Sequence, residues 1–87
     1  MRATPVRDAQ GLSQAIRRRR KELGWTQDQL AARAGLVAKH VSRIETSTHE
    51  PKASTIFAIL AALGLELTLE DAHPTSAARS PGIEHVF

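Results

Sequence analysis

Small and apolar residues recur at helical intervals on both sides of a glycine in residues 27–45, and few folds satisfy that spacing. The pattern predicts two short helices joined by a tight turn. Gly35 stands where the chain must turn sharply, and glycine adopts a positive φ there without steric cost. Ala31 suits a close crossing of two helices because its side chain is small. The apolar positions are Leu30, Ala31, Ala34, Leu36, Val41 and Ile44.

The second of these helices keeps one face without a core to reach. Such a face is free to meet a polar partner, and a helix-turn-helix presents it to the major groove of DNA. A helical hairpin inside any small bundle is the alternative, but the full spacing is much harder to obtain by accident. We therefore predict DNA binding, a hypothesis that depends on the helical context. The positions on this face are Ala38, Lys39, Ser42 and Arg43.

Length and composition agree with a small intracellular domain. The 87 residues allow one domain, which buries only about 60% of its unfolded surface and is marginal alone. The absence of cysteine excludes disulfides and thiolate metal sites. The apolar runs are too short to span a bilayer, and the first residues lack the apolar core of a secretory signal. We expect a cytoplasmic protein that does not bind a membrane.

Charge is divided unevenly along the chain. Residues 1–63 hold eleven Lys or Arg against five Asp or Glu, whereas residues 64–87 hold one against four. The basic part coincides with the predicted helices, as expected for a surface that contacts phosphates. Five consecutive basic residues at 17–21 point around the whole circumference of a helix, so they do not form one surface. We expect two or three of them to reach phosphates or an acidic partner.

Helical periodicity predicts an all-α fold of about four helices. Gly24 and Gly64 follow apolar-periodic runs directly, where helices commonly stop. Thr26 precedes the second run, where a side-chain oxygen can cap a helix. We interpret Trp25 as part of the core rather than as a platform that stacks a nucleotide. The helices are expected at about residues 12–23, 27–34, 38–46 and 53–63.

The hydrophobic period changes after the fourth helix. Leu65, Leu67 and Leu69 alternate with polar residues, which is the pattern of a half-buried strand. The chain has no clear second strand, and a lone strand leaves its backbone groups unpaired. We therefore predict that residues 65–70 form one C-terminal β-strand that pairs with the same strand of a second copy. The alternative is that this segment lies extended over its own core.

Two segments flank the predicted domain of residues 11–71. Residues 1–10 show no periodicity and are expected to form a flexible arm. Residues 72–87 are rich in Pro, Ser and Ala and are expected to form a flexible tail. The apolar end of this tail is interpreted as an interaction or degradation element, and an end without function is the alternative.

Four short stretches together form a specific motif set: LGWTQ at 23–27, Leu-Ala at 30–31, Gly35 and RIE at 43–45. On these residues, positions 12–64 resemble the lambda/434 repressor-type helix-turn-helix, also called the XRE or Cro/C1 family. The continuation into LGLELTL at 63–69, followed by a tail with an aromatic end, resembles HipB-type antitoxins. This resemblance implies a homodimer joined by a β-ribbon, associated with the bacterial nucleoid. It also implies repression of the protein's own operon through operator DNA and binding of a HipA-like serine/threonine kinase toxin. A free-standing XRE-family regulator without a toxin partner is the alternative.

The resemblance also implies roles for single residues. Arg20 and Glu45 correspond to a family ion pair that joins the first helix to the end of the third. Base-reading positions fall on Ala38, Lys39, Ser42 and Arg43. The chemistry agrees, since Lys39 or Arg43 can donate to guanine O6 and N7. The expected phosphate contacts are Gln27, Thr26, Arg18 and His40.

The sequence offers little support for catalysis. It contains no glycine-rich phosphate loop, no nucleophile with a plausible base, and no paired carboxylates near a basic group. Its four histidines show no metal-ligand spacing. We therefore predict that the protein is not an enzyme and needs neither a metal nor a cofactor.

Overall fold

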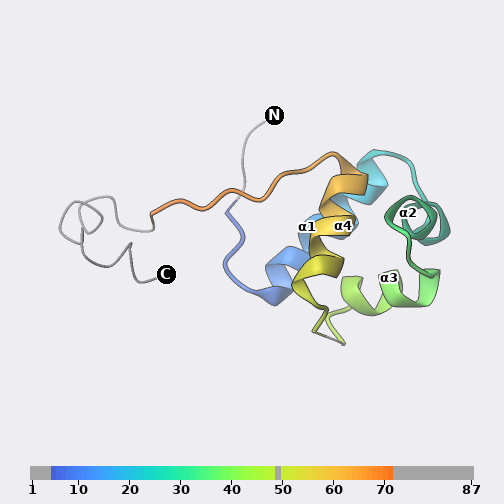
Figure 1. Ribbon diagram of the computed structural model, residues 1–87, viewed down its shortest axis with the longest axis horizontal. Coiled ribbons are helices and arrows are strands. Elements are labelled where there is room, and N and C mark those ends of the chain that lie inside the picture. Colours follow the sequence, from blue (N-terminus) through green and yellow to red (C-terminus); the bar gives the residue numbers. More distant parts are fainter. Residues whose placement is uncertain (1–4, 49, 72–87) are drawn as a thin grey trace.

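The structure, a computed structural model, describes residues 5–48 and 50–71 of the 87-residue chain. The described residues contain four helices joined by loops and no β-strand (Figure 1). The predicted all-α architecture is therefore confirmed. None of these helices is long and apolar enough to cross a membrane. The predicted tail at 72–87 lies outside the described residues. The helices are α1 Ala9–Glu22, α2 Gln27–Ala34, α3 Ala38–Glu45 and α4 Ala53–Leu63.

The start of α1 lies three residues before the predicted one. Asp8 has an extended backbone, and its carboxylate accepts a hydrogen bond from the Gly11 N–H at 2.7 Å. This cap satisfies one of the N–H groups that the first turn of a helix leaves unpaired. Ala9 and Gln10, which we expected in the flexible arm, are therefore helical. Apolar periodicity missed this start because the first turn contributes no buried side chain.

Local capping explains the bounds of α2, which agree with the predicted range. Thr26 Oγ1 accepts a hydrogen bond from the Gln29 N–H at 3.1 Å, and Gln29 Oε1 accepts one from the Thr26 N–H at 2.8 Å. This reciprocal arrangement is a capping box. At the other end Gly35 has φ +74°, a left-handed backbone in which a side chain would be strained. The turn predicted from this glycine is therefore present.

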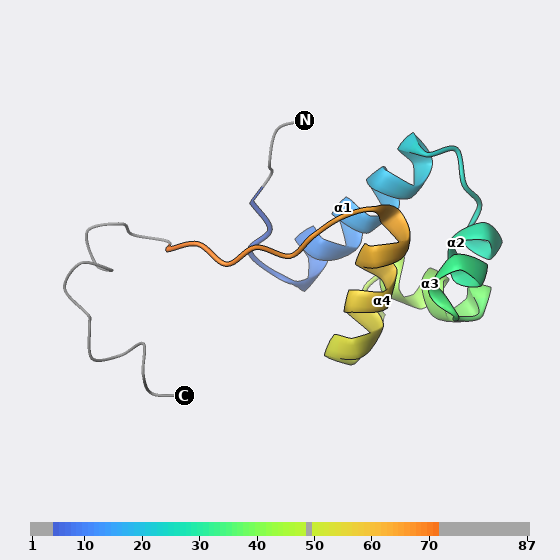
Figure 2. The same ribbon diagram turned by 45° about the horizontal axis from the view of Figure 1, so that its top comes forward.

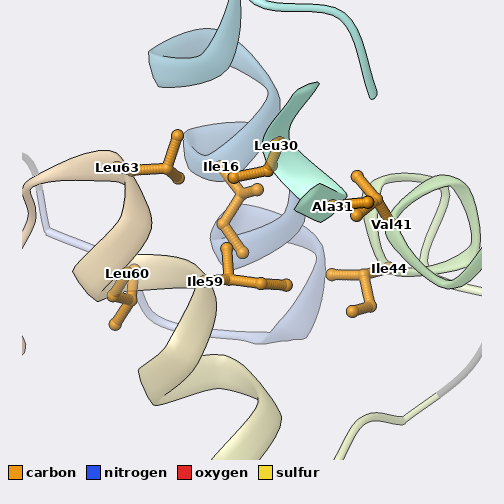
Figure 3. Packing of buried hydrophobic residues seen from close by; sticks show 8 residues of the cluster. All are labelled: Ile16, Leu30, Ala31, Val41, Ile44, Ile59, Leu60 and Leu63. Atoms are coloured by element: carbon orange, nitrogen blue, oxygen red, sulfur yellow. The ribbon is translucent and has the colours of Figure 1, made fainter. Parts of the chain in front are cut away.

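One hydrophobic core lies between the four helices (Figure 3). Both α1 and α2 pack against α3 and α4. Ala31 of α2 lies beside Val41 of α3, where its small side chain permits the close approach that the spacing predicted (Figure 3). Trp25 is partly buried against this core, as expected. The buried apolar residues are Ile16, Leu30, Ala31, Val41, Ile44, Ile59, Leu60 and Leu63.

After α4 the chain runs extended and leaves the helices (Figures 1 and 2). Leu65 packs against the core, and its N–H donates to the Leu60 carbonyl at 2.8 Å. Leu67 and Leu69 are 56% and 90% exposed. Of the three leucines in this segment, only Leu65 covers the core of its own chain, as the alternative expected. Pairing of residues 65–70 with a second copy stays a prediction.

Candidate nucleic-acid interface

The outer face of α3 carries two cationic side chains one turn apart. Lys39 and Arg43 are exposed, and their i, i+4 spacing places them on the same side of the helix. The opposite side is buried through Val41 and Ile44. In the described part of the chain, neither cationic side chain forms an ion pair or a hydrogen bond. Both are therefore free to meet an external anion.

The other predicted contact residues of α3 lie beside these cations. Ala38, His40 and Ser42 are half-buried, so each presents only part of its side chain. No side chain caps the first turn of α3, where Val37 is 67% exposed. The first N–H groups of this helix can therefore bind water or a phosphate oxygen. The structure thus brings the predicted base-reading residues onto one short helix, and their contacts with bases stay a prediction.

A buried ion pair joins α1 to the end of α3. Arg20 Nε donates to Glu45 Oε2 at 2.7 Å, and Arg20 Nη2 donates to Glu45 Oε1 at 3.1 Å. Arg20 Nη1 also donates to the Trp25 carbonyl at 2.7 Å. Each partner of the pair is 8% exposed, so the loss of either one would leave an uncompensated buried charge. Through these bonds α1, the loop after it and α3 are held in one arrangement.

Gln27 at the start of α2 belongs to the same network. Its Nε2 donates to Glu45 Oε1 at 3.1 Å, which orients the side-chain amide. The second N–H of that amide remains for an external acceptor. Thr26 accepts the Gln29 N–H through its hydroxyl oxygen and can still donate its own proton. Phosphate contacts by Gln27 and Thr26 are chemically possible in this geometry and stay a prediction.

Arg18 lies apart from the cationic face of α3. It is two residues from both Ile16 and Arg20, which are buried, and two residues turn a helix by about 200°. Arg18 therefore occupies the outer face of α1, opposite the side that packs on α3. Its predicted phosphate contact would form at a second, separate surface. The hollow beside it has a volume of about 500 Å³ and is lined by Gln14, Arg17, Arg18, Lys21 and Glu22.

The sequence analysis missed two contacts that arginine side chains make. Arg19 Nε donates to the Leu63 carbonyl at 3.1 Å, which links α1 to the end of α4. The Arg33 guanidinium lies over the ring of Trp25, 4.3 Å from its centroid, in a cation–π contact. No local sequence signal indicates either pair, because the first depends on how α1 packs against α4 and the second on the path of the loop before α2. The capping residue Gln29, by contrast, could have been found from its position three residues after Thr26.

The charges at this surface suit an anionic partner. Glu45 is the only acidic residue of α3, and it points inward to Arg20. Because Glu45 points inward, Lys39 and Arg43 dominate the exposed charge of α3. Phosphate groups are the partners that such side chains attract in nucleic acids.

Throughout residues 5–48 and 50–71, no three His, Asp or Glu side chains gather where they could hold a metal ion.

Known proteins share both this sequence pattern and this geometry. Residues 16–69 match the family described as Helix-turn-helix. Antitoxin HipB of Escherichia coli O6:H1 is 35% identical over 65 residues, which are 75% of this chain and 69% of that protein. The chain belongs to the HipB-like XRE helix-turn-helix family. Antitoxin HipB of Escherichia coli strain K12 is also 35% identical over 65 residues, with 74% of its length covered.

Solved structures of HipB have the same fold as this HipB-like chain. A HipB variant in complex with an O2 20mer gives a TM-score of 0.77 at 30% identity, covering 83% of this chain and 100% of that one. The HipB chain of a HipA-HipB-O2-O3 complex gives a TM-score of 0.76 at 30% identity, covering 82% of this chain and 100% of that one. The protein is therefore a helix-turn-helix DNA-binding regulator, from a family of regulators rather than enzymes.

Proposed function

We propose that this protein is a homodimeric repressor of its own operon and an antitoxin that neutralises a HipA-like serine/threonine kinase toxin. The observation that carries the proposal is a cationic α3 face without internal partners in a chain that is 35% identical to Antitoxin HipB. The solved complex that holds HipA, HipB, O2 and O3 together supports both partners. As a repressor, the protein would act at the nucleoid in the bacterial cytoplasm.

In this proposal, α3 enters the major groove of DNA and its side chains contact the edges of the bases. Arg43 and Lys39 would donate to guanine O6 and N7, and Ser42 to several base edges. Ala38 can contact only a thymine methyl group. The N-terminus of α2, with Gln27, would meet the phosphate backbone. Because Gln27 is bonded to Glu45 of α3, this backbone contact would also set how deeply α3 enters the groove.

Dimerisation is assigned to residues 65–70. In the single chain, Leu67 and Leu69 are exposed on an extended segment whose edge has no partner strand in the described residues. Antiparallel pairing with a second copy would satisfy these backbone groups and bury leucines of both chains. A two-fold dimer requires an operator that is an inverted repeat, with half-sites about one helical turn or a multiple apart.

A free-standing regulator is the second candidate, and one relative favours it. The uncharacterized HTH-type transcriptional regulator y4dL of Sinorhizobium fredii is 36% identical over 58 residues, which are 67% of this chain and 30% of that protein. Such a regulator would use the same α3 surface on DNA. It would differ from an antitoxin only in having no kinase partner.

Two assays on the full chain separate these candidates. The first measures the electrophoretic mobility shift of the DNA upstream of the gene, and the second measures co-purification with a kinase-like protein encoded beside it. We expect the Lys39→Ala/Arg43→Ala double variant to lose the DNA shift and to keep the kinase. DNA binding without any kinase complex would identify a free-standing regulator. Failure of the unaltered chain to shift upstream DNA would contradict autorepression.

A further inference from the structure

The chain after α3 turns at a left-handed residue that is not a glycine. At the ends of α2 and α4, the left-handed positions are Gly35 with φ +74° and Gly64 with φ +73°. After α3 the corresponding backbone belongs to Ser47, with φ +59°. Ser47 is the only residue other than glycine with a positive φ in the described parts of the chain. Because a Cβ is disfavoured in this region, a serine here needs a compensating contact.

The hydroxyl of Ser47 makes such a contact with a distant helix. Ser47 Oγ donates to Ser13 Oγ at 2.7 Å, across 34 positions of sequence. Ser13 is 6% exposed and belongs to the buried face of α1, where a hydroxyl needs a hydrogen-bond partner. A glycine at position 47 would adopt the same backbone without strain but could not form this bond.

Ser47 differs from its neighbour in what it binds. Thr46 Oγ1 is bonded to the Ser42 and Arg43 carbonyls at 2.9 and 3.2 Å, so it caps its own helix. Ser47 reaches α1 instead, as Glu45 does through Arg20. The end of α3 is thus bonded to two residues of α1, Ser13 and Arg20, which lie about two helical turns apart along α1. The buried side of α3 and Gln27 of α2 also hold this helix, and the Ser47 bond adds a restraint at its C-terminal end.

We propose that Ser47 is a positioning residue that sets the angle at which α3 is presented to DNA. The proposal rests on the proposed function, because it treats α3 as the helix that reads bases. Arg43 lies in the last turn of α3, close to the attachment. A small rotation there would displace its guanidinium from a guanine edge, and bidentate hydrogen bonds tolerate little misalignment.

The variant Ser47→Gly separates positioning from stability. Glycine relieves the left-handed strain but leaves the buried Ser13 hydroxyl without its partner, so the two effects oppose each other and we expect the thermal midpoint to change little. Operator affinity should nevertheless fall about three- to tenfold, the range that corresponds to loss of one net hydrogen bond, while affinity for scrambled DNA stays nearly constant. Ser47→Ala is the matched control, since it loses the same bond but keeps the strain. It should lower both the operator affinity and the thermal midpoint.

A double-mutant cycle assigns the effect to the contact itself. Ser13→Ala should lower operator affinity as Ser47→Gly does, and the double variant should lose no more than either single variant. Additive losses, an equal loss on scrambled DNA, or full operator affinity in Ser47→Gly would each overturn the proposal.

Amide hydrogen exchange without DNA tests the same contact when operator binding itself is in question. We expect residues 43–48 to exchange faster in Ser47→Gly than in the unaltered chain, because the end of α3 is attached at one point fewer. Unchanged exchange would overturn the positioning role. If the unaltered chain bound no upstream DNA, the proposed function would fail, whereas this comparison would still decide whether Ser47 holds α3.

Discussion

Glu45 accepts hydrogen bonds from two other helices, although it lies in the helix assigned to DNA. Arg20 of α1 donates twice to its carboxylate and Gln27 of α2 donates once. The carboxylate is buried, so these donors replace the water that it would otherwise bind. Glu45 therefore links α1, α2 and α3 through one side chain.

Glu45→Ala should be the most damaging single change among these polar residues. It leaves the Arg20 guanidinium buried without a counter-charge, for which a loss of about 3–5 kcal/mol in unfolding free energy is expected. Urea unfolding followed by circular dichroism measures this. The control is the Arg20→Met/Glu45→Met double variant, which removes both charges and should lose less than Glu45→Ala alone. Unfolding of Glu45→Ala at the same urea concentration as the unaltered chain would contradict this role.

Arg43→Ala should weaken sequence recognition selectively. Loss of a bidentate guanine contact is expected to reduce operator binding by about 1–3 kcal/mol and to relax preference at one base position per half-site. Titration against operator and scrambled DNA measures the difference. Arg18→Ala is the matched control, since it removes the same charge from the outer face of α1, and any effect should be equal on both DNAs. An equal loss on both DNAs for Arg43→Ala would reassign Arg43 to the phosphate backbone.

Among the elements, the segment after α4 is the one that we propose to pair with a second copy. Its first leucine, Leu65, packs on the core, whereas Leu67 and Leu69 are exposed. The contact between Arg19 and the Leu63 carbonyl holds the point from which this segment departs. The helices can therefore fold without the outer part of the segment, although the proposed dimer cannot form without it.

Leu67→Pro should separate folding from dimerisation. Proline removes one backbone donor and is not tolerated inside a paired strand, but Leu67 makes little contact with the helices of its own chain. Sedimentation should show monomers while circular dichroism shows unchanged helix content. Leu65→Ala is the control and should lower thermal stability, because this leucine packs on the core. A Leu67→Pro protein that sediments as a normal dimer would place the interface elsewhere.

For the whole molecule, the distribution of charge governs how it meets DNA. The helical part of the chain is basic and residues 64–87 are acidic, so the net charge of +3 understates the attraction of the helices for phosphate. A dimer would double this basic surface and align two copies of α3 on one duplex.

Operator binding should depend strongly on salt. A dimer that makes about 6–10 phosphate contacts is expected to lose about 10³–10⁵ in affinity between 50 and 200 mM salt, because bound counterions are released from the DNA. Fluorescence anisotropy at a series of salt concentrations measures the slope. The Lys39→Ala variant should give a shallower slope, because it removes one cationic side chain per subunit from the helix that faces DNA. A flat dependence for the unaltered chain would contradict phosphate binding.

Residues 27–45 show how much the sequence determined by itself. The turn at Gly35, the cap at Thr26 and the buried side of α3 were all predictable, because each follows from local backbone preference or from apolar spacing within one helix. The outward direction of Lys39 and Arg43 follows from the same spacing. The start of α1 at Ala9 was missed, because its signal is one capping side chain, Asp8, rather than an apolar stripe.

The tertiary structure alone decided how the basic run at 17–21 is divided. Arg20 is buried on Glu45, Arg19 reaches the end of α4, and Arg18 faces outward. The bond between Ser47 and Ser13 was equally invisible in the sequence. Charge and propensity are the same for neighbouring arginines, so their roles depend on the rotation of α1 about its axis and on partners far away in the chain. Only packing of the four helices around one core sets both.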